Sequence, residues 1–164
     1  MRSFLVSFVV AVLAIVPAHL VAVAQVPGVD APQPTLETSP LIILQGDTSH
    51  TFEVELANDP DEIRVGMMFR ESMDARAGML FDMGNPRPVS FWMKNTILPL
   101  DMLFMDESGT VLAIAENAVP FSRRQIDPGM AVKAVLEVNA GIVDELGLAP
   151  GAQIEHPVFT LAGE

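Results

Sequence analysis

Alternating apolar and polar side chains predict the strands of this chain. In residues 50–56, Phe52, Val54 and Leu56 alternate with polar residues, which places one face of a strand in a core and the other in solvent. Residues 132–138 repeat the pattern. Short apolar runs predict further strands at 41–45, 78–83, 89–94, 100–106, 110–116 and 153–155. The last strand has a possible continuation over residues 158–161.

Capping signals predict two short helices. Asp59 is a good N-cap and Pro60 suits the first helical position, so a helix is expected to begin there and to end near Phe69 or Arg70. Asn139 is expected to cap a second helix over residues 142–146, which Gly147 ends. Many short strands with two small helices predict an α+β domain on an antiparallel or mixed β-sheet that curls toward a barrel.

The N-terminal part of the chain differs in composition from the rest. Arg2, an apolar run over residues 4–16 and the small residues Ala22 and Ala24 predict a signal peptide over 1–24. A retained anchor is the alternative, because the apolar stretch approaches the ~20 residues that cross a bilayer. The proline-rich residues 25–40 are expected to form an extended linker. A single folded domain is then expected over residues 41–161.

Composition narrows the function classes. The chain has 164 residues and 21 acidic against 9 basic side chains, a net charge of −12. Such a surplus disfavours a nucleic-acid partner and, once the signal peptide is removed, binding to anionic membranes. With no cysteine, disulfides and thiol catalysis are excluded. We expect an acidic protein of the periplasm or extracellular space, with no metal and no cofactor, since metal-ligand spacings and phosphate-binding glycine loops are absent.

The densest candidate chemistry lies between Phe91 and Asp101. If residues 89–94 form a strand, Trp92 and Lys94 share a face, and Asp101 can return beside Lys94 or Asn95. An indole surrounded by a few directional polar groups is typical of sites for sugars and peptides. The alternative is structural: Lys94 and Asp101 form an ion pair, and Trp92 fills the core.

Four motifs of the chain resemble a known family. They are Arg64-Val65-Gly66-Met67-Met68-Phe69-Arg70, Gly78-Met79-Leu80-Phe81, Phe91-Trp92-Met93-Lys94-Asn95-Thr96 with Pro99-Leu100-Asp101, and Val135-Leu136-Glu137 with Ala140-Gly141. Their order and spacing resemble the family catalogued as domain of unknown function 192. The resemblance implies a compact, β-rich α+β domain that is often exported and has no established activity.

The resemblance also implies a set of candidate ligand-binding residues. The polar positions of the family's motifs, together with Trp92, are Arg64, Arg70, Trp92, Lys94, Asn95, Thr96, Asp101 and Glu137. The two arginines can grip a carboxylate or a phosphate through paired hydrogen bonds. The same charges can instead form an internal salt-bridge network. No catalytic residue is assigned.

Three functions remain open. The leading hypothesis is an exported, non-catalytic module that binds a small ligand, a glycan or a protein partner near the Trp92–Asp101 loop. The second is a small hydrolase or lyase that uses Lys94, Asp101 or Glu137 as acid or base. The third is Cu(I) binding by methionine, since eight of the ten methionines lie between Met67 and Met105. Core filling by these flexible side chains is the favoured explanation of that cluster.

Overall fold

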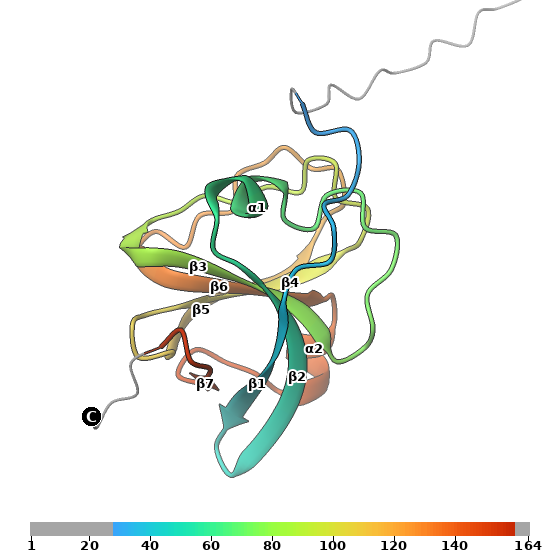
Figure 1. The fold of residues 1–164 in the computed structure, drawn as a ribbon. Coiled ribbons are helices and arrows are strands. Elements are labelled where there is room, and N and C mark those ends of the chain that lie inside the picture. The colour runs from blue at the N-terminus through green and yellow to red at the C-terminus, as the bar shows by residue number, and fades with distance from the viewer. Residues whose placement is uncertain (1–27, 160–164) are drawn as a thin grey trace, which may run out of the picture.

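The computed structural model describes residues 28–159 (Figure 1). The predicted signal peptide and the end of the possible extension at 158–161 lie outside this range. The described chain contains the helices α1 (Pro60–Val65) and α2 (Ile142–Leu146). Its strands are β1 (Thr38–Gln45), β2 (Thr48–Ala57), β3 (Ala77–Pro88), β4 (Leu100–Met105), β5 (Val111–Ala118), β6 (Ala131–Asn139) and β7 (Gln153–Glu155). The α+β class is confirmed.

All seven described strands join one mixed sheet, in the order β5-β4-β6-β3-β2-β1-β7. The strands β2 and β3 run parallel, and the other neighbouring pairs are antiparallel. A parallel pair needs a long crossover, which here is residues 58–76 with α1. The sheet curls into a half-barrel: Thr110 bridges Gln153, and the N–H of Val111 donates to the carbonyl of Ala152 at 2.8 Å. The curled sheet predicted from the sequence is confirmed.

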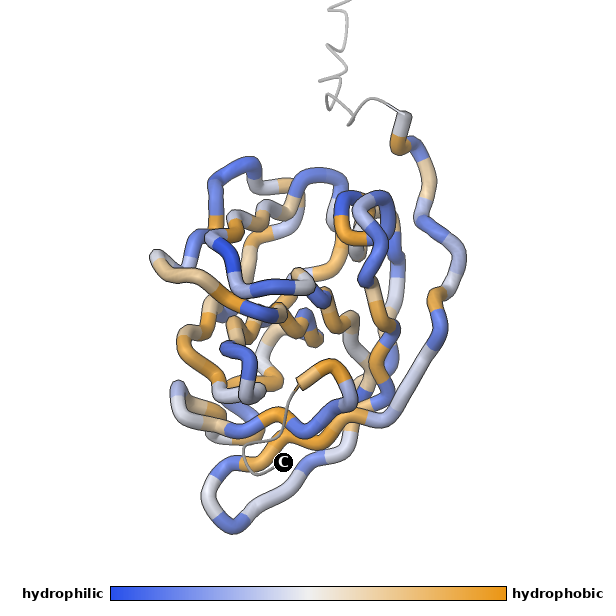
Figure 2. The backbone as a smooth tube through the Cα atoms, turned by 60° about the vertical axis from the view of Figure 1, so that its left-hand side comes forward, coloured by the Kyte–Doolittle hydropathy of each residue, from blue (hydrophilic) through white to orange (hydrophobic). Residues whose placement is uncertain are grey.

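Side chains on the two faces of the central strands form separate apolar clusters. The aliphatic cluster lies under β1, β2, β7 and α2 and includes Leu41, Phe52, Leu80, Leu103, Leu136 and Ile142. The methionine cluster lies on the opposite face and includes Met67, Met79, Met83, Met93 and Met102. Apolar backbone stretches run through the interior, and hydrophilic turns lie outside them (Figure 2). Residues of the irregular loops, such as Leu98 and Ile126, pack against the methionine cluster.

The helix α1 ends earlier than predicted, whereas α2 has the predicted bounds but a different N-cap. Asp59 caps α1 as expected, accepting from the N–H of Asp61 at 2.8 Å. The helix ends at Val65, before the predicted Phe69 or Arg70, because Gly66 takes a φ of 49° that breaks the helical path. The cap of α2 is Gly141 rather than Asn139. Neither helix within residues 28–159 is long enough to span a membrane.

The strand predicted at 89–94 is not formed. Within these residues only Phe91 makes a β-bridge, to Ile126. The strand β3 instead continues to Pro88, and Pro86 and Pro88 lack the N–H groups that a further ladder would need. Asn95 then adopts a left-handed φ of 59°, which turns the chain. Residues 92–99 are therefore a loop over the methionine cluster.

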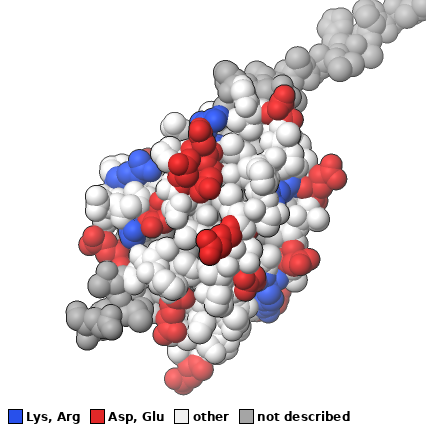
Figure 3. Space-filling model, in the orientation of Figure 1, with Lys and Arg blue, Asp and Glu red and all other residues white. Residues whose placement is uncertain are grey.

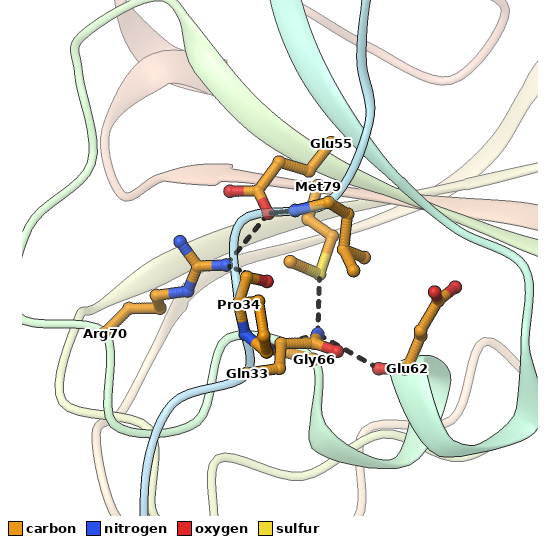
Figure 4. A network of polar contacts seen from close by, with 8 residues as sticks. Gln33, Pro34, Glu55, Glu62, Gly66, Arg70 and Met79 are labelled. Carbon is orange, nitrogen blue, oxygen red and sulfur yellow. Dashed lines mark hydrogen bonds and ion pairs between the residues drawn. The ribbon is translucent and has the colours of Figure 1, made fainter.

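The segment before β1 packs against the domain (Figures 1 and 4). The Gln33 side-chain amide donates to the carbonyl oxygens of Glu62 and Gly66 at 3.2 and 3.0 Å. The Glu62 carbonyl also accepts from the N–H of Gly66 at the end of α1. The N–H of Leu36 donates to the Glu55 carboxylate at 2.7 Å. The strand β1 itself begins at Thr38, within the range 25–40 expected to be a linker. Residues 33–37, which we call the strap, thus belong to the ordered domain.

Candidate functional site

Four of the eight candidate residues line one small cavity. They are Arg64, Trp92, Thr96 and Glu137, and the cavity has a volume of about 40 Å³. Its remaining walls come from Ile63, Val65, Gly66, Met67, Met68 and Phe81. The side chains thus converge from the crossover, β3, β6 and the 92–99 loop. We call this space the Glu137 cavity.

Hydrogen bonds between three loops hold the cavity in place. The N–H of Phe69 donates to the carbonyl of Asn95 at 2.8 Å, which joins the crossover to the 92–99 loop. The N–H of Phe121 donates to the carbonyl of Thr96 at 3.2 Å, which joins the same loop to the β5–β6 connection. The buried Asn95 amide also lies 3.9 Å from the Met68 sulfur. Asn95 therefore organises the loops and does not itself line the cavity.

Backbone strain is concentrated in these loops. Within residues 28–159, four residues other than glycine have a positive φ: Phe69 at 62°, Asn95 at 59°, Asn117 at 52° and Phe121 at 60°. Phe69 and Phe121 are bulky residues for which the left-handed region is unusual. Strain of this kind persists where the surrounding structure enforces it, and it clusters at functional sites. Phe69, Asn95 and Phe121 lie in the loops around the Glu137 cavity and Asn117 lies in β5, but none of the four lines the cavity itself.

Glu137 is the most unusual polar group of the cavity. It lies in β6 between Met79 of β3 and Met102 of β4, and only 4% of its surface is exposed. No hydrogen bond or ion pair joins its carboxyl to another residue of the described chain. The fully buried side-chain atoms without a partner in residues 28–159 are His50 Nε2 and Arg70 Nε, so the Glu137 oxygens still reach solvent through the cavity. Burial disfavours the charged form and raises the pKa of Glu137 to about 8. At neutral pH the carboxyl is mainly protonated.

Thr96 and Trp92 complete the polar and apolar parts of the site. Thr96 is 5% exposed, and its hydroxyl has no hydrogen-bond partner within residues 28–159. Trp92 is 44% exposed, so the expectation that it could fill the core is wrong. The Lys94 Nζ lies 5.3 Å from the centre of the Trp92 ring. The indole therefore borders the cavity and already holds a cation on its ring.

The two candidate arginines are engaged in ion pairs. Arg64 donates through Nε and Nη2 to the Asp61 carboxylate at 3.3 and 3.0 Å, on the surface. Arg70 donates to Glu55 at 2.8 Å and lies beside the strap (Figure 4). Arg70 lines a different groove of about 550 Å³ together with Arg76 and Asp74. The structural interpretation of the arginines is thus favoured over joint anion binding.

The ion pair between Asp101 and Lys94 that the sequence suggested is not formed within residues 28–159. The Asp101 carboxylate is fully buried and accepts from the N–H groups of Asn117 and Val143 at 2.8 and 3.0 Å. Asp101 is occupied by backbone groups, and Lys94 stands over the indole. Glu137 is then the one acid–base candidate of the three that lines the cavity.

Burial of the methionines favours core filling over copper binding. Met67, Met68, Met79, Met83, Met93, Met102 and Met105 are buried, and Met73 packs against the methionine cluster. Among residues 28–159 no group of three or more His, Asp or Glu side chains is arranged to hold a metal ion. Sequence reasoning did not identify Phe81, Gly66 and Met67 as walls of the site, because their motif positions have no polar signature.

The comparisons with solved structures give close relatives. A putative transcription regulator from Sinorhizobium meliloti 1021 is 44% identical, with a TM-score of 0.75 over 77% of this chain and 99% of that one. A protein of unknown function from Novosphingobium aromaticivorans DSM 12444 is 35% identical, with a TM-score of 0.72 over 77% of this chain and 91% of that one. No curated protein matches the chain.

Residues 42–156 match a family model, that of the uncharacterised ACR family DUF192. The match covers the sheet from β1 to β7, including the loops around the Glu137 cavity. The chain belongs to the domain of unknown function 192 family.

Proposed function

We propose that this chain is an exported, non-catalytic binding module whose ligand places a polar group in the Glu137 cavity. One observation carries the proposal: the Thr96 hydroxyl and the Glu137 carboxyl, both more than nine-tenths buried, line one cavity without a protein partner in the described chain. Polar side chains this deeply placed usually have a hydrogen-bond partner. The oxygens of both side chains still reach the cavity, because the fully buried atoms without a partner in residues 28–159 are His50 Nε2 and Arg70 Nε. A bound ligand would supply the missing hydrogen bonds.

The half-exposed indole of Trp92 supports a ligand with an apolar or ring-shaped body. An aromatic side chain beside a small polar cavity can bury part of a ligand while the cavity fixes its orientation. Small sugars, peptides and amines all have this form. Trp92 is the single tryptophan of the chain, so its fluorescence reports on the site directly.

Binding is favoured over catalysis because the candidate acid–base groups are not assembled. A hydrolase or lyase needs at least two cooperating groups near the reacting atoms. Asp101 is held by Asn117 and Val143, and Lys94 lies over Trp92. Apart from Glu137, the only titratable residue among the described residues that line the cavity is Arg64, and Arg64 forms an ion pair with Asp61.

The proposal includes export and excludes nucleic acid. The leader pattern of residues 1–24 supports export. The Sinorhizobium meliloti relative carries the name of a putative transcription regulator. A net charge of −12 opposes contact with phosphate backbones, so we do not extend that name to this chain.

Fluorescence titration tests the binding site. Small amines, sugars and dipeptides are added to the purified protein, and the emission of Trp92 is followed. Glu137→Gln and Thr96→Val should weaken any saturable response by at least about tenfold, through lost hydrogen bonds. Glu107→Gln removes an exposed carboxylate at the β4–β5 hairpin and should leave the response unchanged. Equal affinity in all variants, or turnover of the ligand, would contradict the proposal.

Cell fractionation tests the export part. The protein expressed from its full sequence should be recovered outside the cytoplasm, with Gln25 as the first residue of the processed chain. Recovery of the unprocessed chain in the cytoplasm would refute export and leave the binding site untouched.

A further inference from the structure

We propose that the group bound in the Glu137 cavity is a primary ammonium, as carried by a lysine side chain, a peptide N-terminus or a free alkylamine. This inference rests on the proposed function and names the chemistry of its ligand. It draws on the charges, the hydrogen-bonding capacity, the aromatic walls and the size of the cavity.

The charge balance around Glu137 favours a cation. The charged or titratable residues that line the cavity are Glu137 and Arg64, and the Arg64 guanidinium is directed to Asp61 on the surface. The strand neighbours Met79 and Met102 are neutral. Without a ligand, Glu137 avoids an unpaired buried charge by holding a proton at neutral pH, since buried charges are stable only when they are paired. An ammonium in contact with Glu137 would supply the pairing, whereas a carboxylate ligand would add a second negative charge.

The hydrogen-bonding groups also match an ammonium. A primary ammonium has three N–H donors and no acceptor. No hydrogen bond within residues 28–159 uses the two oxygens of Glu137 or the hydroxyl oxygen of Thr96. Once Glu137 has lost its proton, these three oxygens can accept three hydrogen bonds. Donors and acceptors therefore balance without a bridging water.

The aromatic walls already accommodate a cation of this kind. Lys94 places its Nζ 5.3 Å from the centre of the Trp92 ring, within the range of a cation–π interaction. Trp92 and Phe81 both line the cavity. Because Lys94 occupies one face of the Trp92 ring, the ammonium of a ligand would contact the other face of the indole or the ring of Phe81.

The size of the cavity distinguishes a primary ammonium from larger cations. The volume of about 40 Å³ has room for a group of one or a few heavy atoms. A trimethylammonium group, with three added methyl groups, exceeds that space. On the face shown in Figure 3, acidic side chains are scattered among fewer basic ones. The net charge of −12 will concentrate cations around the protein.

Matched probes test the inference at neutral pH. n-Butylammonium is compared with 1-butanol, butyrate and butyltrimethylammonium by calorimetry and by Trp92 fluorescence. We expect saturable binding of n-butylammonium alone, at least about tenfold weaker in Glu137→Gln and unchanged in Glu107→Gln. Nα-Acetyl-lysine amide and glycinamide, which present a side-chain and an α-ammonium, then distinguish the two peptide sources.

Proton release gives a second readout. Because the pKa of Glu137 is raised to about 8, the carboxyl binds a proton at neutral pH and must lose it to pair with an ammonium. Calorimetry in buffers of different ionisation enthalpy should show nearly one proton released per amine bound. Affinity should rise up to about tenfold per pH unit below the pKa and level off above it.

The outcomes separate this inference from the proposed function. Binding of 1-butanol as strong as that of n-butylammonium, or amine binding without proton release, overturns the ammonium inference and leaves a binding module. The ammonium inference is also overturned, and the binding module retained, if no amine binds but a neutral ligand binds the wild type more tightly than Glu137→Gln. If no ligand of any class binds while circular dichroism shows folded protein, both proposals fail.

Discussion

The Asp101 carboxylate accepts a hydrogen bond at 3.0 Å from the backbone N–H of Val143, which lies 42 positions further along the chain. Val143 is in the first turn of α2, whose N-cap Gly141 has no side chain to satisfy the free N–H groups. A buried side chain of β4 therefore caps a distant helix. Its other oxygen accepts from Asn117, which holds the left-handed turn at the end of β5.

Removal of this carboxylate should destabilise the fold. Asp101→Ala leaves two backbone N–H groups without their acceptor, and each buried unsatisfied group costs about 1–3 kcal/mol. We expect a loss of about 2–5 kcal/mol in the free energy of unfolding, measured in urea. Asp127→Ala, which removes an exposed turn contact with Gly129, should lose less than about 1 kcal/mol. If Asp101→Ala lost no more unfolding free energy than Asp127→Ala, the capping role of Asp101 would be contradicted.

Glu137 should make stability fall as the pH rises. Its pKa is raised from 4.5 to about 8 in the folded protein, so between these values the folded chain holds a proton that the unfolded chain has released. Glu137 therefore contributes its full stabilisation below pH 4.5, the pKa in the unfolded chain. That stabilisation is lost as the pH rises towards about 8, the pKa in the folded chain, at up to about 1.4 kcal/mol per pH unit.

The matched variant isolates this effect. Glu137→Gln keeps the shape and cannot ionise, so its stability relative to the wild type should increase between about pH 5 and pH 9. Urea unfolding at several pH values measures the difference. Parallel stability curves for the two proteins would show that Glu137 is not responsible.

Gly109 should be essential for closure of the half-barrel. It has a φ of 81°, and an added Cβ would lie 2.3 Å from the carbonyl oxygen of Ile154, which is backbone and cannot move aside without disturbing β7. Gly109→Ala should lower stability by about 2–4 kcal/mol, from strain and steric overlap together. Gly84→Ala, with a φ of 74° and open space around the Cβ, should lose only about 1 kcal/mol. If Gly109→Ala and Gly84→Ala lost the same stability, contact between the added Cβ and Ile154 could not be the cause of the loss at Gly109.

The strap should depend on Gln33. Gln33→Ala removes the amide that donates to Glu62 and Gly66, so residues 33–37 should exchange their backbone hydrogens faster (Figure 4). We expect protection of the Leu36 N–H to drop by about fivefold or more, corresponding to about 1 kcal/mol. Gln125→Ala on the exposed β5–β6 loop is the control. Unchanged exchange at Leu36 would show that Glu55 alone holds the strap.

Local patterns predicted most of the fold. The alternation at 50–56 and 132–138 and the cap at Asp59 produced β2, β6 and α1 close to their observed positions. These signals work because burial on one face and satisfaction of helix ends act over a few residues. The strand at 89–94 failed because its apolar residues are covered by loops rather than by a paired strand.

The site was predicted only in part, because it depends on long-range contacts. Motif positions identified Arg64, Trp92, Thr96 and Glu137, which share the cavity. Motif spacing could not show that Asp101 has a structural role instead, because the backbone N–H groups that bind it, of Asn117 and Val143, lie 16 and 42 positions away. The isolation of Glu137 depends on Met79 and Met102 from neighbouring strands, and no local pattern reports which strands are neighbours.

The division of the interior into an aliphatic and a methionine cluster has a consequence for how relatives can diverge. Branched side chains such as Leu136 and Val138 have few shapes, so substitutions beneath α2 must conserve volume. Thioethers on the other face adapt to new neighbours with little penalty. Ligand preference can then change through substitutions in the crossover and in the 92–99 loop, which line the cavity, while the framework beneath them stays constant.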